Sequence, residues 1–277
     1  RFDAAFVVSF TAVYNMRMLD VFRFGASLEN YVGYLLAFVA VTRYYIRRGR
    51  ALEPISIIVA TYLTICGGQP QIAYFGLCGM LVLCLVAPGI VKAISPNAAE
   101  NTGWRSPMEY YRHSLFCIAA GCCLSAVYAV PFYFEYIRDA PGRVHQKYGF
   151  SLAWCDDWHG QLHSFINPLR GDVHCAFGGS SLLLFGLLAP AAARPMRERR
   201  IVATLWLVTL IVLIFSLGSA TPVHKFIWRW LPMVSSFRCP GRATMMLSPI
   251  LALLLAWCLS IENREGREAS ARAGRMA

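Results

Sequence analysis

Charged residues are scarce in this sequence. Asp, Glu, Lys and Arg together make up 15% of its 277 residues, whereas 57% are hydrophobic. Soluble domains carry about 25% charged residues, which cover an apolar core with a hydrated shell. The shortage of charge therefore excludes an ordinary soluble globular domain and predicts a membrane protein.

The sequence also lacks two signatures that would direct the interpretation elsewhere. No recognisable nucleic-acid-binding motif accompanies the net charge of +11, so we expect no nucleic-acid partner. The sequence also shows no signal peptide, which would consist of a basic start, a short apolar run and a small-residue cleavage site in that order. Residue 1 is Arg and the first methionine is Met16, so we expect the membrane domain to be truncated at its N-terminus.

Most of the ten cysteines lie in apolar runs, where cysteine behaves as a small hydrophobic residue. Cys155, Cys175 and Cys239 are the ones in loops or at loop edges. The sequence therefore predicts no disulfide framework. A Cys155–Cys175 bridge stays open if that loop faces an oxidising compartment.

Long uncharged runs define the predicted membrane spans. Residues 54–91 contain no charge, which is too long for one span of about 20 residues. Gly67-Gly68-Gln69-Pro70 interrupts the run, so we predict a helical hairpin over 53–67 and 71–92. Further runs occupy 114–134, 173–193, 201–224 and 243–261, and two weaker segments occupy 4–19 and 29–46.

These segments predict an all-α fold. The expected architecture is a polytopic integral membrane helical bundle of about eight transmembrane helices over residues 1–261. Residues 262–277 are charged and rich in Ala, Gly and Ser, and we expect them to form a disordered cytoplasmic tail.

Clusters of arginine orient the bundle. Arg43–Arg50, Arg194–Arg200 and the arginines after Arg264 all follow even-numbered predicted spans. Cytoplasmic loops carry an excess of Lys and Arg, so both ends of this chain are predicted to be cytoplasmic. Two long outer loops remain, over about 135–174 and 218–242.

The second outer loop predicts a short interfacial helix. Its apolar residues recur at helical spacing: Val223, Phe226, Ile227, Trp230 and Leu231. Lys225 and Arg229 share another face, as expected for a helix with its apolar side in lipid and its cations at the headgroups. Pro232 limits how far this helix continues.

Arg238 and Arg242 follow, just before the last predicted span. The planar guanidinium group suits phosphate, so these two arginines, with Lys225 and Arg229, could bind a lipid phosphate or pyrophosphate substrate. The alternative is that they anchor helix ends by snorkelling to lipid headgroups. The sequence leaves both interpretations open.

The first outer loop supplies the candidate catalytic and metal-binding residues. Asp156 or Asp157 could act as the general base for an acceptor hydroxyl. His159 and His163 are four residues apart, a spacing that could bind a metal, and a neighbouring carboxylate would favour Mg²⁺ or Mn²⁺. Gly160 weakens the helix that this spacing requires, and the alternative is a solvated loop.

The hairpin turn carries two glutamines. Gln69 and Gln71 flank Pro70, where they could bind a sugar or satisfy backbone groups at the helix ends. Near the outer end of the 114–134 run, Pro131 predicts a kink. Glu135 beside it is either structural or catalytic.

Several motifs share their order with a known family. Gly67-Gly68-Gln69-Pro70-Gln71 resembles the Gly-His-Pro-Gln turn of bacterial YfhO-type membrane proteins. The segments Gly218-Ser219-Ala220-Thr221-Pro222 and Phe237-Arg238-Cys239-Pro240-Gly241-Arg242 resemble their Gly-x-x-Thr-Pro and Phe-Arg-x-Pro-x-Arg motifs. Asn167-Pro168 stands ahead of the Gly178-Gly179 span, in the same order of elements. The resemblance covers most of residues 30–260.

This family is similar to the GT-C class of membrane glycosyltransferases. The resemblance implies a polyprenyl-phosphate-linked sugar donor, a cell-envelope glycan or lipid acceptor, and a site on the outer face of the bacterial inner membrane. It places Arg238 and Arg242 near the donor phosphate and Gln69 near the sugar or acceptor. Gln69 replaces the family histidine, and the acid that GT-C enzymes carry in their first outer loop would precede Arg1.

Two other functions remain as alternatives. A transporter or flippase of a lipid-linked glycan would place charged residues inside its spans, and the apolar runs from residue 54 onward lack them. A non-catalytic membrane assembly subunit would need no catalytic acid.

The predicted topology is tested by labelling cysteines from outside intact cells. Cys155 and Cys239 lie in the two predicted outer loops, so a membrane-impermeant maleimide should label both. Cysteines in the predicted spans should stay unlabelled until the membrane is dissolved. Protection of Cys155 or Cys239 by the intact membrane would contradict the topology.

Overall fold

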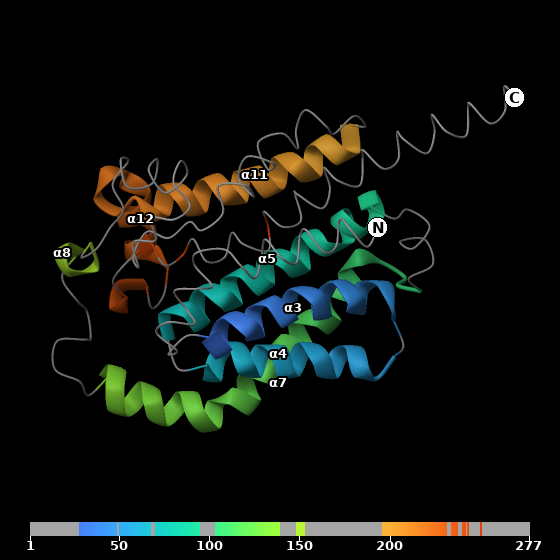
Figure 1. Ribbon diagram of the computed structural model, residues 1–277, viewed down its shortest axis with the longest axis horizontal. Coiled ribbons are helices and arrows are strands. Elements are labelled where there is room, and N and C mark those ends of the chain that lie inside the picture. The colour runs from blue at the N-terminus through green and yellow to red at the C-terminus, as the bar shows by residue number, and fades with distance from the viewer. Residues whose placement is uncertain are drawn as a thin grey trace, which may run out of the picture.

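The computed structural model describes residues 28–48, 50–67, 70–94, 103–138, 148–152, 196–231, 234–237, 240–241, 243 and 250 (Figure 1). The secondary-structure elements in this part of the chain are all helices, without strands. Its long helices are α3 (Leu28–Ile46), α4 (Leu52–Cys66), α5 (Pro70–Ile94), α7 (Pro107–Phe132) and α11 (Met196–Ser216). The predicted all-α class is therefore confirmed for the described residues.

The predicted helical hairpin is observed. α4 ends at Cys66 and α5 begins at Pro70, so the Gly67–Pro70 segment separates two helices within the uncharged run. Pro70 is the first residue of α5, where its missing N–H would have had no intrahelical partner. α3 also matches the weaker segment predicted at 29–46.

α7 begins earlier than its uncharged run and changes form near its end. Ser106 caps its N-terminus by accepting a hydrogen bond from the backbone N–H of Glu109. Pro131 lies inside the last turn and cannot donate a backbone hydrogen bond. The chain then passes into a π-helix, η1 (Tyr133–Arg138), so the disturbance predicted at Pro131 takes the form of a change in helix type.

The apolar run at 201–224 does not form one helix. α11 ends at Ser216, and Gly218 has a φ of +54°, a left-handed conformation that favours glycine. A short 3₁₀-helix, η2 (Gly218–Ala220), leads into α12 (Pro222–Trp230). α12 is the short helix predicted for this loop, and it ends before Pro232.

Two of the described helices are long and apolar enough to cross a membrane, at Pro70–Lys92 and Pro107–Glu135. The second is unlike the core helix of a soluble protein, because only 22% of its apolar window is buried. Phe116 and Val127 on this helix are 74% and 84% exposed. Large apolar side chains exposed along a whole helix favour contact with lipid.

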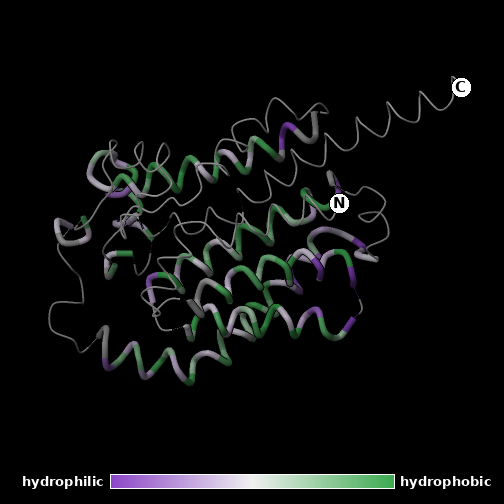
Figure 2. The backbone as a smooth tube through the Cα atoms, viewed as in Figure 1, coloured by the Kyte–Doolittle hydropathy of each residue, from purple (hydrophilic) through white to green (hydrophobic). Residues whose placement is uncertain are grey.

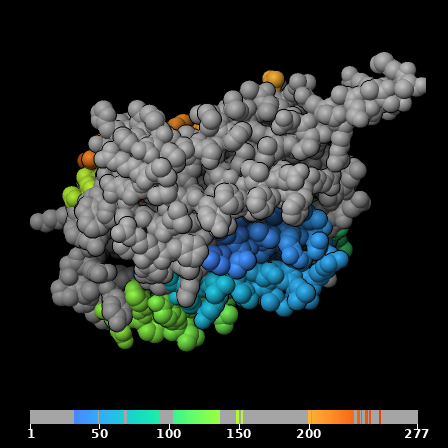
Figure 3. All heavy atoms as spheres, in the orientation of Figure 1, coloured from blue at the N-terminus to red at the C-terminus, as the bar shows by residue number. Residues whose placement is uncertain are grey.

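Four helices, α3, α4, α5 and α7, pack around a shared core. Tyr34 from α3 and Tyr110 from α7 are fully buried in it. The Tyr110 hydroxyl donates to the backbone oxygen of Val41 at 3.3 Å, so this buried polar group has a partner. α3 and α4 lie side by side on the face of the molecule seen in Figure 3.

Glycines set how closely these helices approach. A Cβ placed on Gly33 of α3 would lie 2.5 Å from the backbone nitrogen of Thr64 in α4. A Cβ on Gly121 of α7 would lie 2.8 Å from the backbone oxygen of Ile58, also in α4. Contact of backbone with backbone through small residues is typical of helix packing in membranes.

Two buried threonine hydroxyl groups of α4 are satisfied within the same helix. Thr61 and Thr64 donate to the carbonyls of Ile57 and Ala60 at 2.8 and 2.7 Å. Bonds of this type, to the carbonyl four residues earlier, let a polar side chain lie in an apolar environment without an unpaired donor.

Part of the predicted bundle lies outside the described residues. This holds for the spans at 4–19 and 173–193, for nearly all of the span at 243–261, and for the tail. The total of about eight spans therefore stays a prediction.

Replacing Gly33 with alanine should destabilise the bundle, because the new methyl group meets the α4 backbone, which cannot rotate away. Overpacking of this kind costs about 1–3 kcal/mol. Gly149→Ala is the matched control, since nothing lies within 4 Å of a Cβ there. Thermal denaturation in detergent should show a midpoint several degrees lower for Gly33→Ala only; equal midpoints in both variants would contradict the close contact.

Candidate functional site

The two ends of the bundle differ in chemistry. The C-terminal ends of α3 and α5 and the N-terminal ends of α4, α7 and α11 gather at one end, on the right of Figure 1. The described cations there are Arg43, Arg47, Arg48, Arg50, Lys92, Arg105, Arg112, Arg199 and Arg200. Hydrophilic residues mark this end in Figure 2. We call it the basic end.

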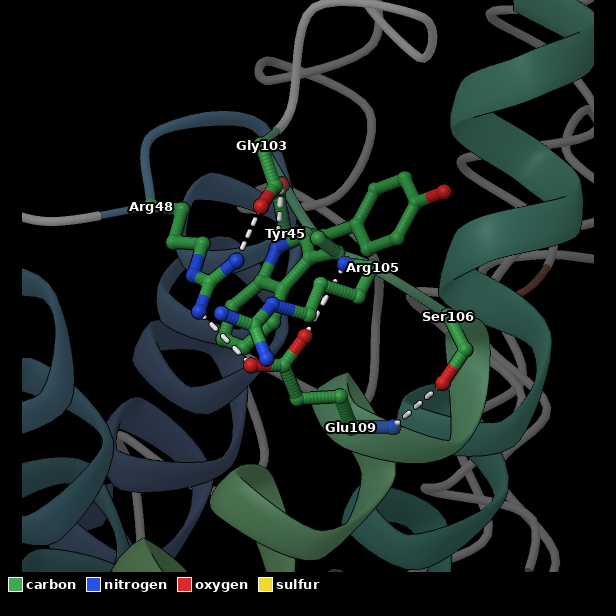
Figure 4. A network of polar contacts seen from close by, with 7 residues as sticks. Tyr45, Arg48, Gly103, Arg105, Ser106 and Glu109 are labelled. Carbon is green, nitrogen blue, oxygen red and sulfur yellow. Dashed lines mark hydrogen bonds and ion pairs between the residues drawn. The ribbon is translucent and has the colours of Figure 1, made fainter.

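At the basic end, Arg48 ties the α3–α4 connection to the start of α7 (Figure 4). Its Nη2 atom lies 2.6 Å from Oε1 of Glu109, and its Nη1 atom donates to the backbone carbonyl of Gly103. The other carboxylate oxygen of Glu109 accepts a hydrogen bond from the backbone N–H of Arg105 at 2.9 Å. Glu109 is therefore held by two positively polarised groups.

Trp104 completes this connection. Its indole N–H donates to the carbonyl of Tyr45 at 3.0 Å, and the Arg48 guanidinium lies 4.7 Å from its ring centroid. A guanidinium over an indole face is an attractive cation–π contact. Nearby, Nη2 of Arg43 lies 3.1 Å from Oε1 of Glu53. This ion pair compensates the buried carboxylate of α4. The contacts at the basic end thus fasten helices together.

The opposite end brings together segments that are far apart in sequence. Beside α12 lie α8 (Tyr148–Ser151), from the first predicted outer loop, and η3 (Val234–Ser236), from the second. Aromatic side chains join them in a chain of ring contacts with centroids 5.0 to 6.5 Å apart: Tyr74, Phe75, Phe237, Phe215, His224, Tyr148 and Trp228. We call these seven residues the aromatic cluster.

His224 is the polar centre of the aromatic cluster. Its ring lies 5.0 Å from Phe215 and 5.6 Å from Tyr148, and the residue is 2% exposed. Its Nδ1 atom is 3.5 Å from the Tyr148 hydroxyl. Burial lowers the pKa of His224 to about 4, because an apolar environment disfavours the imidazolium. The imidazole is therefore neutral at pH 7.

The indole N–H of Trp228, one turn after His224, is buried and has no hydrogen-bond partner among the described residues. Tyr148 contacts the rings of both His224 and Trp228. The cluster therefore holds a donor that a bound ligand or the rest of the chain would have to satisfy.

Lys225 and Arg229 occupy the outer face of α12. Both are exposed and lie one helical turn apart. The Lys225 ammonium is 6.0 Å from the centroid of the Tyr148 ring, and the Arg229 guanidinium is 5.9 Å from that of Trp230. Phe226 and Trp230 are largely exposed, so α12 presents an apolar face and a cationic face outward, as predicted for an interfacial helix.

An apolar groove of about 400 Å³ opens beside the aromatic cluster. Its described lining comes from α4, α5, α7 and η1 and includes Ile65, Tyr74, Leu77, Ala126, Tyr133 and Phe134. Tyr74 belongs to both the groove and the aromatic cluster. The groove could therefore hold a hydrocarbon chain whose polar end reaches the cluster.

Three predicted site residues are described. Lys225 and Arg229 lie on α12 near Tyr148, while Gln71 is buried in the first turn of α5, in a position that suits the capping interpretation. The others lie outside the described residues: Gln69, Asp156, Asp157, His159, His163, Arg238 and Arg242. Two described residues from the same predicted loops belong to the aromatic cluster. Tyr148 comes from the loop that contains Asp156, and Phe237 directly precedes Arg238.

Sequence reasoning missed His224, Tyr148 and the rings that contact them. One signal was present: His224 and Trp228 are four apart, on a face of α12 between its apolar and cationic faces. Tyr148 had no comparable signal, because its partners are more than 70 residues away. Among the described residues no group of three His, Cys, Asp or Glu is placed to hold a metal ion.

Comparison with known proteins does not assign the chain to a family. No family model, curated protein or solved structure matches it. The resemblance to YfhO-type proteins and to the GT-C class stays a prediction from the quoted motifs.

His224 should make the docking of α12 depend on pH. An unfolded histidine takes up a proton near pH 6.5, whereas buried His224 does so near pH 4. The stability that the buried, neutral His224 contributes is therefore fully present above pH 6.5. It is lost as the pH drops from 6.5 to 4. Thermal midpoints between pH 7.5 and 4 should fall less in His224→Leu than in the native protein.

His113→Gln is the control for this measurement, because His113 is exposed at the basic end. It should keep the full decrease with falling pH. A decrease of the same size in His224→Leu would show that other groups cause it.

Proposed function

We propose that this protein is a membrane glycosyltransferase that uses a polyprenyl-phosphate-linked sugar. The sugar is transferred to a cell-envelope acceptor on the outer face of the bacterial inner membrane. The acceptor hydroxyl attacks the anomeric carbon, the bond from that carbon to the phosphate oxygen breaks, and polyprenyl phosphate leaves. Asp156 or Asp157 is the proposed base that takes the hydroxyl proton.

The aromatic cluster is the observation that carries this proposal. It supports a shared site because Tyr148 from the first outer loop and Phe237 from the second lie in one chain of ring contacts. Phe237 immediately precedes Arg238, so the segment with the proposed phosphate-binding arginines starts at the cluster. Had these anchors lain at opposite ends of the bundle, no single pocket could have formed between the loops.

Two further features support a lipid-linked donor. The apolar groove at Tyr74 suits a polyprenyl chain, which makes contacts without hydrogen bonds. Lys225 and Arg229 on the exposed face of α12 suit a phosphate at headgroup level. Together with Arg238 and Arg242, these cations would stabilise the negative charge of the departing phosphate.

The described helices weigh against a transporter or flippase. α5 has no charged residue before Lys92, and α7 has none between Arg112 and the end of the helix at Phe132. The buried carboxylate of Glu53 is paired with Arg43 at the basic end, away from the middle of the bundle. A translocation pathway for a charged glycan carrier would need polar groups along the spans. A non-catalytic assembly subunit remains the alternative that activity measurements distinguish.

The proposal is tested by sugar turnover in proteoliposomes that contain the full-length protein and a panel of polyprenyl-phosphate sugars. Arg238→Ala, Arg242→Ala and the double variant Lys225→Ala/Arg229→Ala should each reduce release of polyprenyl phosphate by about tenfold or more, the loss expected for a charge-assisted hydrogen bond. Arg200→Ala removes one exposed cation at the basic end and should leave turnover unchanged.

Normal turnover in Arg238→Ala, in Arg242→Ala and in the Lys225→Ala/Arg229→Ala double variant would disprove the phosphate-binding role. No release from any donor, combined with movement of the intact donor between leaflets, would identify a flippase. Neither activity, with loss of a cell-envelope polymer in cells that lack the protein, would identify an assembly subunit.

A further inference from the structure

The start of α7 carries a second surface that the proposed transferase does not use. A hollow of about 610 Å³ lies at the basic end, and the described residues that line it are Ser106, Met108, Glu109, Arg112, His113 and Phe116. We infer that this hollow binds an anionic phospholipid of the cytoplasmic leaflet, with its phosphate at Arg112 and an acyl chain along Phe116.

Arg112 provides the unused positive charge. It is exposed and forms no ion pair with another described residue. The one carboxylate in the described lining, Glu109, is already engaged by Arg48 and by the Arg105 N–H. Its negative charge is therefore compensated, and the hollow as a whole favours an anion.

The neighbours of Arg112 along the helix are apolar and face outward. Met108, Arg112 and Phe116 are spaced four residues apart, so they form one stripe with steps of about 6 Å along the axis. Met108 is 63% exposed and Phe116 is 74% exposed. Phe116 is one turn further along α7 than Arg112, away from the basic end, so an acyl chain that runs along the helix from the headgroup would pass over it.

This combination selects a lipid over an acidic protein segment. A protein partner at the headgroups would meet Arg112 but would leave Phe116 and the exposed Leu115 uncovered at the depth of the acyl chains. One phospholipid supplies both contacts, a phosphate for the cation and a hydrocarbon chain for the apolar side chains below it. Arg105, whose backbone N–H holds Glu109, adds a second positive charge beside the hollow and favours a net negative headgroup over a zwitterionic one, whose own cation it would repel.

The inference rests on the membrane placement of α7 and is independent of sugar transfer. It is tested by native mass spectrometry of the purified full chain in detergent, titrated with dioleoyl phosphatidylglycerol or with dioleoyl phosphatidylcholine. Phosphatidylglycerol should bind more tightly. Arg112→Gln should weaken its binding about fivefold, and Arg112→Lys should keep it within about twofold, because one cation near an anionic surface has an effect of this size.

Arg50→Gln is the matched control. It removes one exposed arginine from the same end of the bundle but lies outside the described lining of the hollow, so it should change the affinity less than about twofold. Phe116→Gln should weaken binding of the dioleoyl lipid and leave binding of a short-chain phosphatidylglycerol unchanged.

Three results would overturn the inference. Equal weakening by Arg50→Gln and Arg112→Gln would indicate a diffuse surface charge. Equal affinity for phosphatidylcholine and phosphatidylglycerol would remove the role of lipid charge. Unchanged binding in Arg112→Gln would assign the hollow to another occupant, such as an acidic segment of a partner protein.

Discussion

Backbone contact at Gly33 and Gly121 is the constraint on which the described bundle depends. Because these glycines have no side chain, α3 and α7 both approach α4 until backbone atoms nearly touch. That approach buries Tyr34 and Tyr110 in a common core and fixes the axial position of each helix against its neighbours. Helices in lipid gain little from the hydrophobic effect on association, so van der Waals contact of this kind must supply much of their attraction.

Fixed axial positions give the bundle two chemically different ends. The short connection between α3 and α4 puts the arginines that follow α3 beside the start of α7, where Arg48 reaches Glu109 and Trp104. At the other end, α5 begins and α11 finishes, so Phe75 and Phe215 meet and form a base for α12. Ionic contacts fasten one end, while aromatic contacts gather loops at the other. The proposed chemistry and the proposed lipid site therefore lie at opposite ends and can be tested separately.

Residues of the candidate site differ in how far the sequence could predict them. Lys225 and Arg229 were found because residues four apart lie on the same face of an α-helix, which is a local relationship. Gln71 was identified, but its burial in the first turn of α5 depends on the packing of that helix. His224 and Tyr148 contact each other across 76 positions of sequence, and no local pattern links them. Their meeting follows from the place where α11 ends and α12 turns back.

The sequence by itself determined the helical class, the hairpin around Gly67 and the amphipathic character of α12, because each follows from periodicity or from a turn within a few residues. It also separated the arginine clusters from the aromatic loops. Tertiary structure alone decided that Tyr148, His224 and Phe237 share one cluster, that Glu109 is neutralised by Arg48, and that Arg112 is left exposed among apolar side chains. The physical reason is that ring contacts and ion pairs act over a few ångströms in space, and helix packing sets which distant residues come within that range.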